Sequence, residues 1–205
     1  GRSDVISLTD EDEDGNEQIV YGNTKSENYA HAADPKASIK ILAIGNSFSQ
    51  DAMNNHLYQV LESAGYEEIV LGNMYIGGCP ISTHATNARE NLPAYSYEKN
   101  ATGTKKSYKN STLLDGILDE EWQGITLQQV SNLAAVKDSL TDGDFDYLLQ
   151  FVKENKNADA KIYYHATWAY ADEYDFKNFQ KYFTDTADMD QKIAEAVTDV
   201  VKTKA

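Results

Sequence analysis

Short apolar runs alternate with segments of helical periodicity from residue 39 onward, and this alternation limits the possible folds more than any other feature. Residues 39–44, IKILAI, are followed by Gly45, which is typical of a buried parallel strand. Apolar residues then recur at helical spacing over 51–64, before Gly65. Strands separated by helices predict an α/β sandwich with a mostly parallel sheet. We expect strands at 39–45, 68–75, 125–130 and 161–165, and helices at 51–64, 113–122, 145–155 and 189–201.

Two stretches do not follow this pattern. Residues 1–38 include an acidic run at 10–14 and few apolar side chains, so burial offers little to offset the entropy lost on ordering. We therefore predict a flexible acidic tail or linker over 1–38 and one α/β domain over 39–205. Residues 93–112 are polar and rich in tyrosine. They fit either a lid over a site or a surface hairpin held by cross-strand aromatic pairs.

Charge and cysteine content exclude several classes of function. The chain has 33 acidic and 18 basic residues, a formal net charge of −15. Phosphate binding requires clustered Lys and Arg, so this charge argues against a nucleic-acid partner. No apolar run approaches the ~20 residues that a membrane span needs. Cys79 is the single cysteine and no CxxC, HExxH or EF-hand pattern is present, so we expect no internal disulfide and no metal site.

A serine lies where the first predicted strand meets the first predicted helix. Ser47 follows Gly45 and Asn46, so its hydroxyl would lie at the edge of the sheet, beside backbone N–H groups that can bind an oxyanion. Asn46, Ser47 and Ser49 are equally typical of residues that turn the chain and cap a helix. On spacing alone both interpretations stand, and capping is the simpler one.

The next two predicted strands end in further hydrogen-bond donors. Gly77 and Gly78 follow the second strand and leave backbone amides open to a ligand. Gln128 and Asn132 follow the third strand and carry amide groups that can donate to a developing negative charge. Ligands bind beyond the carboxyl ends of the strands in open parallel sheets. These groups and Ser47 would therefore form the donor set that acyl transfer requires.

Four sequence blocks carry a resemblance to a known family. They are ILAIGNSFSQD at 41–51, YIGGCPISTH at 75–84, WQGITLQQVS at 122–131 and HATWAY at 165–170. In this order they resemble the SGNH/GDSL hydrolases, and among them a branch of bacterial, often exported proteins of the DUF4886 type. The resemblance implies a three-layer α/β/α sandwich of the SGNH hydrolase type, similar to the flavodoxin fold.

The resemblance also implies roles for individual residues. Ser47 matches the nucleophile, and its own N–H matches one oxyanion donor. Gly78 matches the glycine that supplies a second donor. The third donor, an asparagine in the family, matches either Asn132 or Gln128. Asn46 stands where the broader family has an aspartate, a change that the branch shares.

One part of the family pattern is not found in the sequence. The resemblance implies a catalytic Asp-His block after the last strand, and no such block precedes Ala205. We therefore expect the domain to be incomplete at its C-terminus. His84 and His165 follow the second and fourth strands and are the alternatives for an internal base. His165 fits equally well as a packed strand residue, and His84 as a loop or capping residue.

Aromatic residues follow the fourth strand. Trp168 and Tyr170 fit a wall for a sugar or acyl group, and they fit equally well as residues that close the core over the last helix. We expect Asn46, Gly77, His84, His165 and Trp168 to contact substrate.

The pattern and the resemblance together predict an exported bacterial serine esterase: periplasmic, a cell-surface lipoprotein or secreted. Its substrates would be small acyl esters, among them acetylated carbohydrates, and it would need no cofactor. The alternative is a non-catalytic carbohydrate- or ligand-binding module that keeps the cleft without a base. A flavodoxin-like binding domain fits less well, because the first loop lacks the run of Ser, Thr and Gly that cradles a phosphate.

Overall fold

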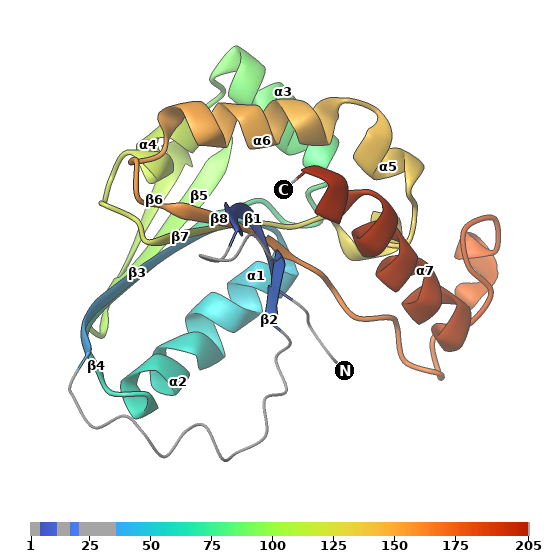
Figure 1. Ribbon diagram of the computed structural model, residues 1–205, viewed down its shortest axis with the longest axis horizontal. Coiled ribbons are helices and arrows are strands. Elements are labelled where there is room, and N and C mark those ends of the chain that lie inside the picture. Colours follow the sequence, from blue (N-terminus) through green and yellow to red (C-terminus); the bar gives the residue numbers. More distant parts are fainter. Residues whose placement is uncertain (1–4, 12–16, 21–35, 205) are drawn as a thin grey trace.

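One eight-stranded sheet runs through the molecule (Figure 1). The computed structural model describes residues 5–11, 17–20 and 36–204. The strands lie in the order β2-β1-β8-β7-β3-β4-β5-β6. Their bounds are β1 Val5–Glu11, β2 Glu17–Val20, β3 Lys36–Gly45, β4 Tyr66–Tyr75, β5 Tyr95–Ala101, β6 Thr104–Ser111, β7 Gly124–Leu127 and β8 Lys161–His165.

The α/β class is confirmed, but the sheet is mixed and not mostly parallel. Its centre is parallel, because β3 pairs in parallel with both β4 and β7, and β7 pairs in parallel with β8. Antiparallel hairpins extend both sides: β5–β6 beside β4, and β1–β2 beside β8. The four strands expected from apolar runs are the central ones. The strands of the hairpins are largely polar, and strand pairing of this kind leaves little trace in apolar periodicity.

Helices lie on both faces of the sheet (Figure 1). The helices α3, α4 and α6 cover one face, whereas α1 and α2 lie on the other. The α-helices are α1 Ser47–Asp51, α2 Leu57–Ser63, α3 Ile81–Glu90, α4 Leu113–Ile117, α5 Asp138–Thr141, α6 Asp144–Asn155 and α7 Thr186–Asp199. Between α1 and α2 lies a π-helical segment, η2 (Ala52–His56), and short 3-10 helices are η3 Ser131–Leu133, η4 Phe176–Phe179 and η5 Val201–Lys204.

The structure differs from the expected tail at its described residues. The strand β1 pairs antiparallel with β8, with Val5 opposite His165, and β2 pairs with β1. β-Branched residues such as Val5 and Ile6 favour strands, and the exposed edge of β8 offers them backbone partners. The rest of the expected tail before Lys36 lies outside the described residues. The strand β3 begins at Lys36, three residues before the apolar run.

The polar, tyrosine-rich stretch forms the hairpin β5–β6, one of the two expected alternatives. Tyr97 and Tyr108 lie opposite each other in the register, and their rings stack with centroids 5.8 Å apart. The Tyr97 hydroxyl donates to Asp119 Oδ2 at 2.7 Å. The cross-strand aromatic pair therefore links the two strands as the sequence suggested.

The main core lies between the parallel strands and the layer of α3, α4 and α6. Trp122 is fully buried there, and its Nε1 donates to the Gly116 carbonyl at 2.8 Å, which fixes the ring. Gly72 on β4 lies opposite Leu42 on β3. A Cβ at Gly72 would lie 2.7 Å from Trp122 Cη2 and 2.9 Å from Leu42 Cδ1. The fixed indole thus requires glycine at position 72.

We expect Gly72→Ala to lower the free energy of unfolding by about 1–3 kcal/mol, because the methyl group overpacks a ring that cannot move away. Urea denaturation measures the change. Gly77→Ala is the control, since its Cβ would meet only the hydroxyl of Tyr75 closer than 3.4 Å, at 3.1 Å. Equal stability of the two variants would show that Trp122 does not restrict position 72.

Candidate functional site

The parallel register brings four strand ends to one edge of the sheet. Gly45 of β3 pairs with Tyr75 of β4, Ile44 pairs with Leu127 of β7, and Leu127 pairs with Tyr164 of β8. The residues that follow these strands therefore gather at the carboxyl edge, where open α/β sheets bind ligands. We call this the strand-end site, and define it as residues 45–49, 76–79, 128–132 and 165–168.

Ser47 is the first residue of α1 and is exposed. Its neighbour Asn46 is 1% exposed and takes the capping role, with Oδ1 accepting from the Phe48 N–H at 3.2 Å. The Asn46 Nδ2 donates to the Cys79 carbonyl at 3.2 Å, which ties the first loop to the second. Because Asn46 caps the helix, the Ser47 hydroxyl is not needed for that purpose. No hydrogen bond joins it to another side chain among the described residues.

Ser49 has a structural environment, in contrast to Ser47. It is buried, and its Oγ lies 2.9 Å from the Asn46 carbonyl and 3.1 Å from Asn73 Oδ1, so its single proton is shared between two acceptors. A Cβ at Gly45 would lie 2.7 Å from Ser49 Oγ and 2.8 Å from Gln128 Oε1. The close approach of these two side chains therefore requires glycine at position 45.

Gln128 and His165 form a pair at the ends of β7 and β8. The Nε2 of buried Gln128 lies 3.1 Å from His165 Nδ1. Its Oε1 is buried beside Gly45 with no hydrogen-bond partner among the described residues. Burial lowers the pKa of His165 to about 4, so the ring is neutral near pH 7. The Gln128 amide is thus oriented by His165 rather than by solvent.

His84 lies in the core, on α3. It is fully buried, its Nδ1 is 2.9 Å from the Tyr95 hydroxyl, and the two rings stack. Burial lowers the pKa of His84 to about 4. His84 is therefore neither a loop nor a capping residue, and the expected contact with substrate is wrong for this position because a fully buried ring offers no surface to a ligand.

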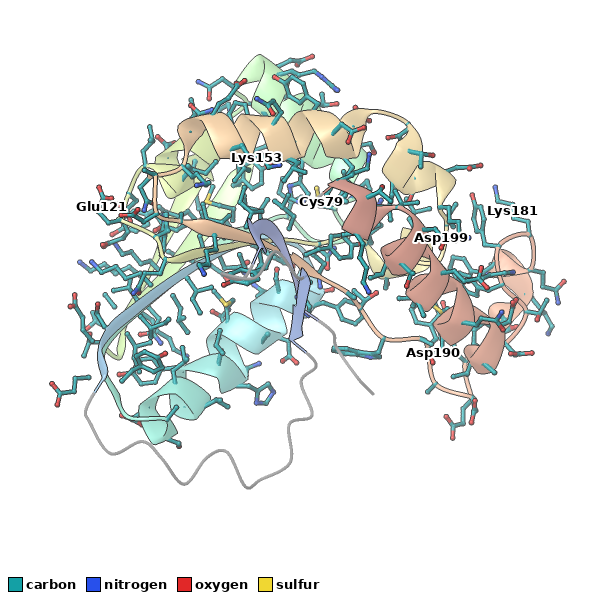
Figure 2. The ribbon with its side chains drawn as sticks, in the orientation of Figure 1. Cys79, Glu121, Lys153, Lys181, Asp190 and Asp199 are labelled. Carbon is teal, nitrogen blue, oxygen red and sulfur yellow. The ribbon has the colours of Figure 1, made fainter. Side chains whose placement is uncertain are left out.

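The second loop presents backbone amides. Gly77 and Gly78 are exposed, and Gly78 has a φ of +63°, which L side chains rarely adopt. No atom lies within 4 Å of the position that a Cβ of Gly78 would take. Cys79 follows, in the interior (Figure 2), where burial raises the pKa of its thiol to about 12. The thiol therefore stays protonated and is no nucleophile at neutral pH.

In the third loop, the buried side chain of Gln129 hydrogen-bonds three other residues, a role that was not predicted from the sequence. Gln129 is 1% exposed; its Oε1 accepts from the N–H groups of Ile81 at 3.0 Å and Val130 at 2.9 Å. Its Nε2 donates to Ser139 Oγ at 3.0 Å. Asn132 lies in η3 and is half-buried. Of the two glutamines in the block, Gln129 therefore holds the loop and only Gln128 adjoins Gly45.

The two aromatic residues after β8 have different environments. Trp168 is 40% exposed, and its ring meets Phe48 edge-on, with centroids 4.6 Å apart. It therefore contacts the residue that follows Ser47 in the sequence. Tyr170 packs into an aromatic cluster with Tyr174, Phe176, Phe179 and Phe183, and its hydroxyl is 3.0 Å from Ser131 Oγ. Trp168 is thus accessible to solvent, whereas Tyr170 packs in an aromatic cluster.

A large apolar groove opens on the face of the sheet that carries α2. Its volume is about 880 Å³. Ser49 and His165 contribute to its lining, which joins the groove to the strand-end site. The walls are mainly apolar residues from β3 and from the segment η2–α2: Ile39, Ile41, Ala43, Ala52, Met53, Leu57 and Val60.

The described residues contain neither a cluster of metal-ligating side chains nor a membrane-spanning helix. No three His, Cys, Asp or Glu side chains within residues 5–11, 17–20 and 36–204 are grouped so that they could hold a metal ion. Over the same residues, no helix has the length and apolar character that crossing a membrane requires.

Comparison with known proteins gives two matches. Residues 40–203 match the model of a domain of unknown function, DUF4886. The chain is similar to a DUF4886 family protein from Bacteroides uniformis ATCC 8492, whose crystal structure was determined at 1.50 Å resolution. The two share 35% sequence identity with a TM-score of 0.77, over 82% of this chain and 64% of the other. The chain thus spans less than two thirds of that protein's length. No curated protein matches the chain.

The buried histidines predict a dependence of stability on pH. An unfolded histidine binds a proton near pH 6.5, whereas His165 binds one only near pH 4. Stability from this residue is therefore complete above pH 6.5 and is lost as the pH falls toward 4. We expect His165→Gln to reduce the slope of unfolding free energy against pH between 6.5 and 4.5 by up to about 1.4 kcal/mol per unit. Urea titrations at each pH measure it, and above pH 7 both slopes should coincide. Identical slopes below pH 6 would mean that His165 protonates normally in the fold.

Proposed function

The chain belongs to the DUF4886 family, which is defined by a domain of unknown function. We infer an activity for it from the geometry of the strand-end site. We propose that the protein is a serine ester hydrolase, with the three-layer α/β/α sandwich of the SGNH type. Its substrates would be small acyl esters, in particular acetyl groups on carbohydrates. An exported, bacterial location is part of the same proposal.

The observation that carries this proposal is the contrast between Ser47 and Asn46. Both follow the first strand, yet Asn46 is buried and caps α1 while Ser47 is exposed. A capping serine would be bonded to its own helix. An exposed hydroxyl beside open backbone amides is instead what a nucleophile needs.

In the proposed reaction, Ser47 Oγ attacks the carbonyl carbon of the ester while a base takes its proton. The oxyanion would be bound by the N–H groups of Ser47 and Gly78 and by an amide from Gln128 or Asn132. The proton then passes to the leaving alcohol, and water hydrolyses the acyl-enzyme in a second step. Trp168 would form a wall for the sugar or acyl group.

The base is proposed to come from an Asp-His block in a part of the protein that the described residues do not include. His84 is fully buried, and His165 is bonded to Gln128 with its pKa lowered to about 4, which makes it a weak base. The solved DUF4886 relative is longer, since the chain covers 64% of it.

A carbohydrate- or ligand-binding module is the second candidate. The observation in its favour is that neither His84 nor His165 hydrogen-bonds the Ser47 hydroxyl among the described residues. Without general-base assistance, worth about 10²–10⁴-fold, Ser47 would contribute little to hydrolysis, although the cleft and Trp168 would remain able to bind a sugar.

The test is covalent labelling of the full-length protein with an organophosphonate probe, read by mass spectrometry, together with p-nitrophenyl acetate hydrolysis. We expect an adduct on Ser47, and we expect Ser47→Ala to abolish both labelling and turnover. Ser49→Ala is the comparison, because Ser49 helps to hold the residue before Ser47 and does not itself touch the reacting atoms. It removes a buried hydrogen bond worth about 1 kcal/mol, so labelling should persist within about tenfold of the wild-type rate. An unlabelled Ser47 with measurable glycan binding would favour the binding module.

A further inference from the structure

A carboxylate on the hairpin β5–β6 is hydrogen-bonded to the helical segment that begins with Ser47. Glu98, on β5, is half-buried and accepts hydrogen bonds with both oxygens. Its Oε1 accepts from Gln50 Nε2 at 2.8 Å, and its Oε2 accepts from Asn54 Nδ2 at 2.9 Å. Gln50 lies in α1 and Asn54 lies in η2. One carboxylate thus joins α1 and η2 to the strand β5.

The same carboxylate is connected to the residue before Ser47 by a second route. Asn73, on β4, is 1% exposed, and its Nδ2 donates to Glu98 Oε2 at 3.3 Å. Its Oδ1 accepts from Ser49 Oγ at 3.1 Å, and Ser49 Oγ also lies 2.9 Å from the Asn46 carbonyl. Since Asn73 offers its nitrogen to Glu98 and its oxygen to Ser49, each partner orients the amide for the other.

The π-helical segment η2 lies between α1 and α2 and is held by the same carboxylate. A π turn holds one more residue than an α turn, is rare, and frequently occurs at functional sites. The segment η2 follows directly after α1, with Met53 buried against the sheet and Asn54 bonded to Glu98. These contacts hold the wide turn in place, directly after α1. Ser47 is the first residue of that helix, which ends at Asp51.

We propose that Glu98 is a positioning residue for Ser47, acting through Gln50, Asn54 and the Asn73–Ser49 pair. The inference rests on the proposed function, because it assigns Glu98 a role in placing the nucleophile. Glu98 does not touch the reacting atoms. Its carboxylate restrains α1 so that the Ser47 hydroxyl and the Gly78 amide face the same carbonyl group, and a displacement of 1 Å in such a geometry can cost about 10²-fold in rate.

The chain contains a matched control. Glu120 is a half-buried carboxylate that also bridges elements, accepting from Lys40 Nζ of β3 at 2.9 Å and from Lys99 Nζ of β5 at 2.5 Å. Lys99 is the neighbour of Glu98 on the same strand. Glu120 makes no hydrogen bond to α1 or η2 among the described residues. Its loss should therefore affect stability without moving Ser47.

The experiment compares Glu98→Ala, Glu98→Gln and Glu120→Ala in the full-length protein. Hydrogen exchange is measured over residues 47–57, and phosphonate labelling and kcat and KM for p-nitrophenyl acetate are measured in parallel. For Glu98→Ala we expect faster exchange in α1 and η2, with labelling and kcat lowered about 10–100-fold and KM changed less than about threefold. Glu98→Gln should restore most of the rate, because its oxygen can keep the bonds to Asn54 and Asn73 while the Gln50 amide turns over. Glu120→Ala should leave exchange over 47–57 and labelling near wild type.

Two results would overturn the positioning role: unchanged exchange over 47–57 in Glu98→Ala, or an equal loss of labelling in Glu98→Ala and Glu120→Ala. The second would show general destabilisation. An inert Ser47 in the wild-type protein is a different outcome, since it would remove the proposed function. The exchange measurement does not depend on activity, so it would still decide whether Glu98 holds α1 in place.

Discussion

The strand β3 pairs in parallel with β4 on one side and with β7 on the other, and the rest of the molecule depends on this pairing. Its register with β4 runs from Lys36 opposite Tyr66 to Gly45 opposite Tyr75. A shift of one residue would turn every buried side chain of β3 to the other face of the sheet, so packing fixes the register strongly. Because the register is fixed, the loops after β3, β4 and β7 begin at the same height. The strand-end site is a product of that alignment.

Burial then decides which groups at this edge remain reactive. The imidazoles of His84 and His165 are kept neutral by desolvation, and the thiol of Cys79 is kept protonated for the same reason. Among the described residues, burial thus makes these two imidazoles weak bases and keeps this thiol from ionising. Ser47 differs from these three residues because its side chain is exposed to solvent. The chemistry that the site can perform is limited less by which residues are present than by which of them reach solvent.

The sequence predicts the parts of the fold that apolar residues dominate. The run at residues 39–44 becomes β3, and the strand expected at 161–165 is β8 with the same bounds. The predicted strand ends also placed Ser47, Gly78 and Gln128 at one edge of the sheet, and the register of the strands agrees with this placement. The hairpin β1–β2 and the helix α3 were missed, because an acidic strand and a helix rich in small and polar residues lack a clear apolar period. The burial of His84 follows from α3, and so it was not foreseeable without that helix.

Contacts between polar side chains were also beyond the reach of the sequence. Glu98 and Asn73 bond to each other only because β4 and β5 are antiparallel neighbours, with Asn73 opposite Glu98 in the register. Nothing in the local pattern around either residue signals that pairing. The π-helical turn is similar, since the residues at 51–64 show ordinary helical spacing. Such features depend on the tertiary arrangement, which decides where a polar group finds its partner.

The polar composition of β6 bears on how the protein behaves at high concentration. β6 is the outermost strand beside β5, and residues 104–110 are all exposed. An exposed strand edge is a template on which a second sheet can add. Here the edge carries Lys105, Lys106 and Lys109, so a second copy docking edge to edge would bring like charges together and remove them from water. The hairpin whose Glu98 is hydrogen-bonded to α1 and η2 thus also ends the sheet in a form that resists growth into a larger one.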